Sequence, residues 1–187
     1  MELFGSYTSP YVRHCRIVLM QLGQPFTLVE TNNDASAKGS PTKRVPYLRD
    51  GDRFLSDSNS ILQYARRKAG QHFLDDLDDA ERFYLANTAL EATVNIFQME
   101  KDGIVPAQSA YLQRQAARAE AVLEKLNSDK LDVGGAPTSD SVLRIACFLG
   151  WALFRKRIDL GPYANLTKFF ESAQRIPHFK ETAPPAA

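Results

Sequence analysis

The stretch that decides the fold is Pro46-Tyr47-Leu48-Arg49-Asp50-Gly51-Asp52-Arg53-Phe54-Leu55. Two short runs with strand character flank Asp50-Gly51-Asp52, and an Asp-Gly pair supplies the positive φ that a tight hairpin turn requires. The segment therefore predicts two antiparallel strands joined by a short turn.

Strand and helix patterns alternate on both sides of this hairpin. Residues 31–44 are polar and predict a loop that includes one helical turn. The order βαβ, connection, ββα predicts a small sheet with helices on its faces. The other expected elements are a strand at Leu3-Phe4, a helix over 10–22 that ends at Gly23, a strand over 26–29 and a helix over 56–69 closed by Gly70.

Strand signals vanish after the acidic segment 75–79, and apolar residues then recur at helical spacing. Phe97, Tyr111 and Trp151 lie on these apolar stripes and are expected in the core. The Pro-rich segment 177–187 is expected to lie extended. The predicted helices cover about 83–97, 112–126, 142–154 and 164–174. The sequence thus predicts an α+β chain with an α/β domain over 1–74 and an all-helical domain over 75–187.

Composition excludes several classes of protein. The 187 residues hold 23 Lys and Arg against 22 Asp and Glu, a net charge of +1. Counterion release on a nucleic acid needs a clustered basic excess that this chain lacks, so we expect no nucleic-acid partner. The longest apolar stretch, 145–154, is too short to span a bilayer, so we expect no membrane partner.

The start of the chain and its cysteines favour a cytoplasmic address. The residues after Met1 lack the basic, apolar and small-residue regions of a secretory signal. Cys15 and Cys147 lie far apart and are expected to be reduced structural thiols. The three histidines share no metal-ligand spacing, so we expect no metal site.

Ser9 begins the first predicted helix in a hydroxyl-rich segment. Pro10 suits the first helical turn, and Ser9 before it suits the N-cap. Capping alone explains these residues. The same geometry favours a bound anion, because free N–H groups and the positive end of the helix dipole would stabilise a thiolate beside a serine hydroxyl.

Two further segments have both a structural and a binding interpretation. Pro46 starts a strand, and a cis Val45–Pro46 bond would turn the Val45 backbone outward to pair with an extended peptide. Asp57 and Ser58 open the last helix of the first domain, where they cap it. A helix N-terminus with a hydroxyl also binds a carboxylate, and an adjacent Asp accepts from an ammonium group.

Taken in order, three segments resemble the glutathione S-transferase family. Residues 9–13 are similar to its Ser-x-x-x-Arg motif, 40–48 to Asn-Pro-x-Gly-Lys-Val-Pro-x-Leu, and 55–61 to Leu-x-(Glu/Asp)-Ser-x-x-Ile. The resemblance covers essentially the whole chain. It implies a thioredoxin-like domain followed by a helical domain that holds the acceptor substrate.

The resemblance implies a role for each candidate residue. Ser9 would activate the glutathione thiol, with Tyr7 as the alternative because some branches of the family use a Tyr. Glutathione would be a co-substrate bound by Ser9, Arg44, Val45, Pro46 in a cis bond, Asp57 and Ser58. Two departures affect the glycyl end of glutathione: Lys43 replaces the family's Gly, and Ser40 replaces its Asn.

The function expected from the resemblance is a cytoplasmic, homodimeric glutathione transferase of the detoxifying kind, which attacks a small electrophile. Two other functions stay open. The chain is alternatively a non-catalytic scaffold with the transferase fold, or a glutathione-dependent disulfide reductase or peroxidase.

Overall fold

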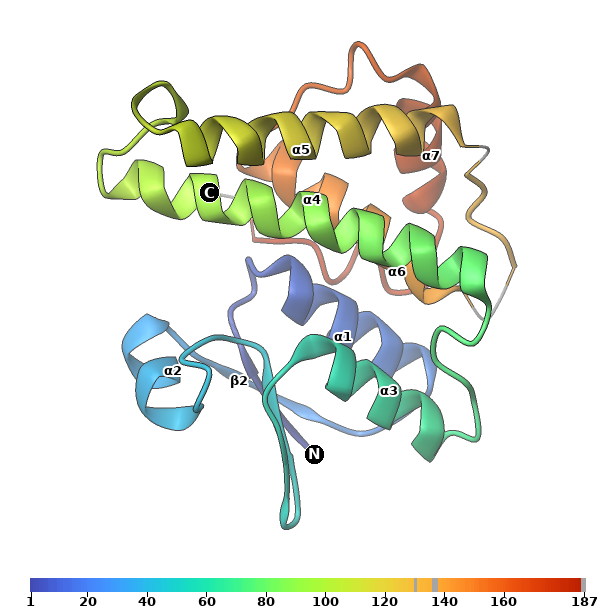
Figure 1. Ribbon diagram of the computed structural model, residues 1–187. Coiled ribbons are helices and arrows are strands. Elements are labelled where there is room, and N and C mark those ends of the chain that lie inside the picture. The colour runs from blue at the N-terminus through green and yellow to red at the C-terminus, as the bar shows by residue number, and fades with distance from the viewer. Residues whose placement is uncertain (130, 136–137, 186–187) are drawn as a thin grey trace. The chain divides into compact units, whose positions relative to one another are not determined.

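The computed structural model describes every residue except 130, 136–137 and 186–187 (Figure 1). The chain divides into two compact units, of which the second is Asp76–Gln174. The first unit is Met1–Asp75 together with the segment that starts at Arg175. From the sequence we expected everything after residue 74 in the helical domain, whereas the structure groups the described residues 175–185 with the first unit.

A four-stranded sheet of order β2-β1-β3-β4 forms the centre of the first unit. Strand β1 (Glu2–Gly5) pairs in parallel with β2 (Thr27–Glu30) and antiparallel with β3 (Tyr47–Asp50). Strand β4 (Arg53–Leu55) pairs antiparallel with β3. The sheet confirms the α+β prediction and the order of strands along the chain.

Glycine is required at two points in this sheet. Gly51 has φ +58° in the turn between β3 and β4, which confirms the predicted hairpin. At Gly5, a Cβ atom would lie 2.4 Å from a methyl group of Val12, which is fully buried. The absence of a side chain at Gly5 therefore lets the first helix pack directly on the end of β1.

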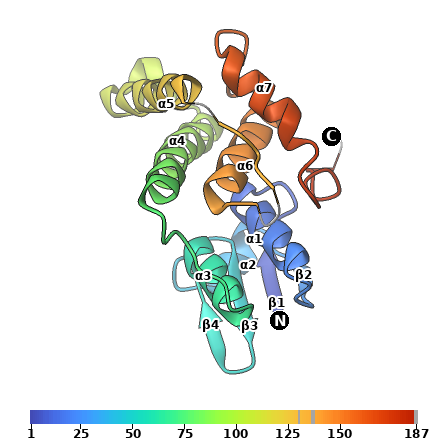
Figure 2. The ribbon, with the colours of Figure 1, turned by 90° about the vertical axis from the view of Figure 1, so that its right-hand side faces the viewer.

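Three helices accompany the sheet. Helices α1 (Pro10–Gln21) and α3 (Ser58–Lys68) pack against each other, as Figure 2 shows. Helix α2 (Asn33–Gly39) is a correction to the expected loop: the Asn32 side chain accepts from the Ala35 amide at 2.9 Å and so caps a seven-residue helix.

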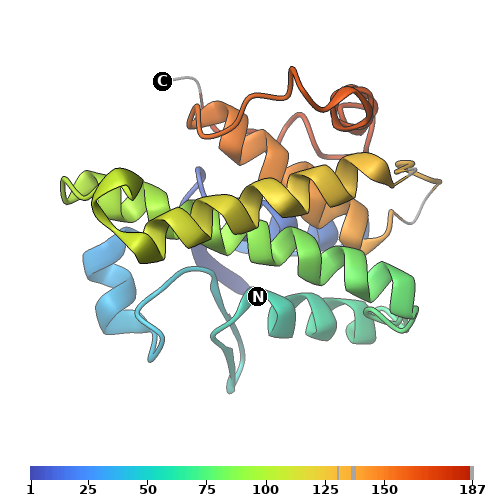
Figure 3. The same cartoon turned by 45° about the horizontal axis from the view of Figure 1, so that its top comes forward.

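In its described residues, the second unit has helices and no strands. Helices α4 (Leu77–Lys101) and α5 (Ala110–Ser128) run side by side (Figures 1 and 3), joined through the short 3-10 helix η1 (Pro106–Gln108). Helix α6 (Asp140–Phe154) is buried along nearly its whole length, and α7 (Ala164–Ala173) completes the unit.

The aromatic residues expected in the core differ in their burial, and Phe97 is half-buried. Trp151 is buried and meets Phe97 edge-on, with ring centroids 5.7 Å apart. Tyr111 is 53% exposed, so its expected place in the core is wrong. Helical spacing identifies an apolar stripe but does not say how far a partner helix covers it. In the described part of the chain, no helix is long and apolar enough to cross a membrane.

The segment that follows α7 was expected to lie extended, and its described part forms turns instead. The Phe179 amide donates to the Ile176 carbonyl at 3.1 Å, and the Ala183 amide donates to the Lys180 carbonyl at 3.1 Å. Phe179 and Thr182 are buried. The turns exist because this segment packs on α1, which the local sequence could not indicate.

Candidate functional site

The register of the sheet brings the candidate segments to one end of it. Phe4 pairs with Tyr47, so the residues that follow β1 lie at the same end as those that precede β3. Leu48 pairs with Leu55, so the residues that follow β4 lie there too. Ser9, Val45–Pro46 and Asp57-Ser58 therefore come from three connections at a single end of the sheet.

Two contacts tie these connections together. The Thr42 hydroxyl donates to the Ser56 carbonyl at 3.4 Å, which joins the loop before β3 to the loop before α3. The Cys15 thiol of α1 lies 3.9 Å from the Ser58 carbonyl, with sulfur as the donor. The middle of α1 and the loop before β3 thus both contact the segment that begins α3.

Ser9 is the N-cap of α1, as predicted. Its Oγ accepts a hydrogen bond from the Val12 amide at 3.3 Å. The cap uses a lone pair of the oxygen, and the hydroxyl proton is not donated to any group in the described part of the chain. Capping and donation to a bound anion are consequently compatible roles for the same hydroxyl group.

Tyr7, the alternative to Ser9, has a different environment. Tyr7 is 38% exposed, and the Arg16 guanidinium lies 5.1 Å from the centroid of its ring. Burial lowers the pKa of Arg16. The nearby Tyr7 and Glu181 oppose this effect and raise the pKa in part. Tyr7 therefore makes a cation–π contact with Arg16, whereas Ser9 caps α1.

The Val45–Pro46 peptide bond is cis, as the resemblance implied. Pro46 is buried, Val45 is half-buried and Arg44 is exposed. Within the described ranges, the Val45 amide and carbonyl take part in no hydrogen bond. An extended peptide laid beside Val45 would find both a donor and an acceptor there.

Lys43, at the position of the family's Gly, has the backbone conformation that favours glycine. Its φ is +53°, its amide donates to the Ser40 carbonyl at 3.0 Å, and its side chain is exposed. Ser40, at the position of the family's Asn, is buried and shares a hydrogen bond of 2.9 Å with the Thr42 hydroxyl. Lys43 thus adopts a left-handed conformation that glycine would adopt without a Cβ penalty.

Asp57 and Ser58 open α3, as predicted. The Asp57 carboxylate accepts from the Asn59 amide at 2.7 Å, and its side chain is exposed to solvent. Ser58 is buried, and its hydroxyl donates to the Asn59 side-chain oxygen at 3.4 Å. An exposed carboxylate beside a helix N-terminus complements the ammonium and carboxylate groups of an amino acid.

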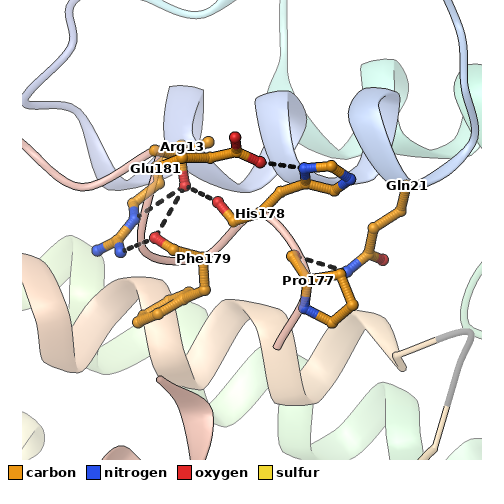
Figure 4. Close-up of polar contacts among 7 residues, drawn as sticks. Arg13, Gln21, Pro177, His178, Phe179 and Glu181 are labelled. Carbon is orange, nitrogen blue, oxygen red and sulfur yellow. Dashed lines mark hydrogen bonds and ion pairs between the residues drawn. The ribbon is translucent and has the colours of Figure 1, made fainter. Parts of the chain in front are cut away.

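Arg13 is a residue whose importance sequence reasoning missed. It is only 5% exposed, and its guanidinium donates to the Phe179 carbonyl at 2.6 Å (Figure 4). Its presence in the Ser-x-x-x-Arg motif is the one signal in the sequence, but the motif does not reveal the partner. Among the described residues, no group of three or more His, Cys, Asp and Glu side chains is arranged to hold a metal ion.

Comparison with known proteins agrees with this geometry. Residues 3–73 match the family described as glutathione S-transferase, N-terminal domain. The GST-like protein YibF of Escherichia coli, itself uncharacterized, is 29% identical over the full length of both chains. Glutathione S-transferase Z1 of Arabidopsis thaliana is 24% identical over 98% of this chain and 91% of its own length. The first domain thus matches the glutathione S-transferase N-terminal domain, and the whole chain is similar to glutathione S-transferases and GST-like proteins.

Solved structures of glutathione S-transferases show the same fold as this chain. A glutathione S-transferase from Methylobacillus flagellatus, with glutathione bound, superposes with a TM-score of 0.84 at 23% identity over 98% of each chain. A second, from Methylobacterium radiotolerans in complex with glutathione sulfonate, gives 0.83 at 24% identity over 100% of this chain and 95% of its own. The thioredoxin-like first domain and the helical second domain are both confirmed.

Proposed function

We propose that this chain is a glutathione transferase in which Ser9 donates a hydrogen bond to the thiolate of bound glutathione. The observation that carries the proposal is the Ser9 hydroxyl at the N-cap of α1, whose proton is not used by the cap. Ser9 is the donor and orienter, and the nucleophile is the glutathione sulfur.

The energetics of thiol activation fit this position. Lowering a thiol pKa by about two units requires roughly 2.7 kcal/mol of preference for the thiolate. One charge-assisted hydrogen bond contributes about 1.5–3 kcal/mol, and a helix N-terminus contributes about 0.3–1 kcal/mol more. The hydroxyl and the start of α1 together are sufficient to hold the sulfur as an anion near neutral pH.

The remaining candidate residues match the rest of the tripeptide. Val45, next to the cis bond to Pro46, offers its backbone to the cysteinyl unit. Asp57 and Ser58 offer a carboxylate and a helix N-terminus to the γ-glutamyl end. Arg44 is exposed beside Val45 and supplies a positive charge. Glutathione is thus the co-substrate that these groups complement, and the solved relatives that hold glutathione or its derivatives support this assignment.

The finer features of the proposal follow from the family likeness. The second substrate is a small electrophile held by the helical unit, the protein works as a homodimer in the cytoplasm, and its reaction belongs to detoxification. The assay that identifies the reaction uses two substrates, an aryl halide for conjugation and a small disulfide for glutathione-dependent reduction.

Isothermal titration with glutathione tests the proposal first. A transferase binds glutathione, and the ultraviolet absorbance of the bound thiolate titrates below the pKa of free glutathione. It then consumes the aryl halide faster than the uncatalysed reaction. Absence of heat in the titration would assign the chain to the scaffold class, and turnover of the disulfide alone would assign it to the reductases.

A further inference from the structure

The segment after α7 is fastened to α1 at two separate points. The Arg13 guanidinium donates to the Phe179 carbonyl at 2.6 Å, near the start of the helix. At the other end of α1, the side-chain amide of Gln21 donates to the Pro177 carbonyl at 3.3 Å (Figure 4). We call residues 176–182 the return segment, because the chain comes back to the first unit there.

The contact at Arg13 buries a positive charge. The Arg13 carbon Cζ lies 3.9 Å from the centroid of the Phe179 ring, and Nε donates to the Thr182 hydroxyl at 3.5 Å. Burying a charge is costly unless the surroundings supply hydrogen bonds and a polarisable partner. Arg13 is therefore held in place by acceptors that the return segment supplies.

Thr182 fixes the shape of the return segment at that point. Its side chain is fully buried, and its hydroxyl donates to the His178 carbonyl at 2.7 Å while accepting from Arg13. The nearby Arg16 guanidinium donates to the Thr182 carbonyl at 3.4 Å. The hydroxyl of Thr182 thus orients the turn that presents the Phe179 carbonyl to Arg13.

Arg13 is coupled directly to Ser9 through the helix backbone. The Arg13 amide donates to the Ser9 carbonyl at 3.0 Å, and the Val12 amide, one residue earlier, donates to the Ser9 hydroxyl. A shift of the Arg13 side chain toward solvent would move the first turn of α1. That turn is the part of the helix that holds the Ser9 hydroxyl.

We propose that the return segment positions the Ser9 hydroxyl for thiolate stabilisation, with Arg13 and Thr182 as positioning residues that do not touch glutathione. This inference rests on the proposed function. A purely structural return segment would stabilise the fold and leave the pKa of bound glutathione unchanged. A positioning segment alters that pKa and turnover, and alters glutathione affinity much less.

The test compares variants at the two ends of α1. Thr182→Val keeps the shape of the side chain and removes its hydroxyl, Thr182→Ser restores the hydroxyl, and Arg13→Lys keeps the charge without the planar fork. Gln21→Ala is the matched control. It removes a contact to the same segment at the far end of the helix, about 18 Å from Ser9 at 1.5 Å per residue.

The readouts are the thiol pKa of bound glutathione, kcat and KM for glutathione, and circular dichroism to confirm folding. We expect Thr182→Val and Arg13→Lys to raise the thiol pKa by about one unit, which lowers thiolate content and turnover about tenfold below that pKa. We expect KM for glutathione to change by less than about twofold. Gln21→Ala and Thr182→Ser should keep the wild-type pKa.

The outcomes separate this inference from the proposed function. A wild-type protein that does not lower the thiol pKa of glutathione overturns both. If the wild type lowers it and folded Thr182→Val keeps the wild-type value, the proposed function stands and the positioning role is wrong. If Gln21→Ala raised the thiol pKa as much as Thr182→Val does, the positioning role would also be wrong. The effect would then not depend on the contacts at Arg13. If Arg13→Lys does not fold, the thiol pKa in Thr182→Val alone tests the positioning role.

Discussion

The phenol of Tyr64 donates a hydrogen bond to the Asp50 carboxylate at 2.7 Å, which joins α3 to the end of β3 beside the hairpin turn. The Lys68 ammonium donates to the same carboxylate oxygen at 2.6 Å. The bonds from Lys68 and Tyr64 lower the pKa of Asp50, and the bond to Asp50 raises the pKa of Tyr64. One side-chain network therefore links the hairpin to the helix that carries Asp57 and Ser58.

This network predicts a pH-dependent stability. Because the pKa of Asp50 is lower in the folded state, its contribution is complete above the unfolded value of about 3.9 and is lost as the pH falls through the folded value. Asp50→Asn should lower the free energy of unfolding at neutral pH, and its difference from wild type should shrink in acid. Urea unfolding across pH measures this. Asp52→Asn, in the adjacent turn, is the control, and an equal loss there would contradict the prediction.

The mechanism predicts that Ser9→Ala raises the pKa of bound glutathione and lowers turnover at least about tenfold, which corresponds to about one pKa unit. The variant also loses an N-cap, which costs about 1 kcal/mol of stability. Ser109 caps α5 in the same way, with its hydroxyl 3.4 Å from the Leu112 amide, so Ser109→Ala is the matched control. It should lose similar stability and keep full turnover. Unchanged turnover in Ser9→Ala would remove this hydroxyl from the mechanism.

Ser58→Ala should weaken the binding of glutathione and leave its thiol pKa unchanged. Loss of the hydroxyl at the start of α3 weakens the contact with the γ-glutamyl carboxylate, and we expect glutathione to bind about tenfold more weakly, or about 1.4 kcal/mol. The thiol pKa of the bound fraction should stay at the wild-type value. Isothermal titration measures the affinity, with Ser60→Ala on the exposed side of the helix as the control. Retained affinity would leave Ser58 with a structural role only.

Lys43→Gly should stabilise the protein. Lys43 has φ +53°, and a residue with a Cβ atom pays roughly 1–2 kcal/mol in the left-handed region, partly offset by the greater chain entropy of unfolded glycine. We expect a net gain of up to about 1 kcal/mol in denaturant unfolding. Lys38→Gly, within α2, should lose about 1 kcal/mol instead. Equal effects at both positions would mean that the backbone conformation of Lys43 is unimportant.

Gly5→Ala should destabilise the first unit by about 1–3 kcal/mol, because the added methyl group overlaps Val12 in a fully packed place. Gly135→Ala adds the same methyl group where no atom lies within 4 Å, and should change stability by less than about 0.5 kcal/mol. Chemical denaturation of the two variants measures the difference. A neutral Gly5→Ala would show that α1 can move away from β1 without cost.

Local chemistry made much of the fold predictable. Gly51 in its turn and the caps at Ser9 and Asp57 depend only on neighbouring residues, and all three are as the sequence indicated. In the second unit, the start of α6 follows the same local rule, because a serine stands directly before its first residue, Asp140. Ser139 caps this helix, with its Oγ 3.4 Å from the Val142 amide.

The features that escaped prediction depend on distant partners. The return segment has turns because its carbonyl groups meet Arg13, more than 160 residues earlier in the chain. Tyr111 has the spacing of a core residue, but about half of its surface is exposed in the described structure. At the candidate site, residue types and spacing indicated Ser9, Val45 and Asp57, whereas their meeting at one end of the sheet required the strand register.

The return segment also bears on how the protein is made. Its residues follow the whole helical unit in the sequence, so the Phe179 carbonyl and the Thr182 hydroxyl reach Arg13 only after the ribosome has completed that unit. A nascent chain that ends after the sheet would contain every strand of the first unit and would still lack the return segment that packs on α1. The first domain thus completes its packing around α1 only with residues made last in synthesis.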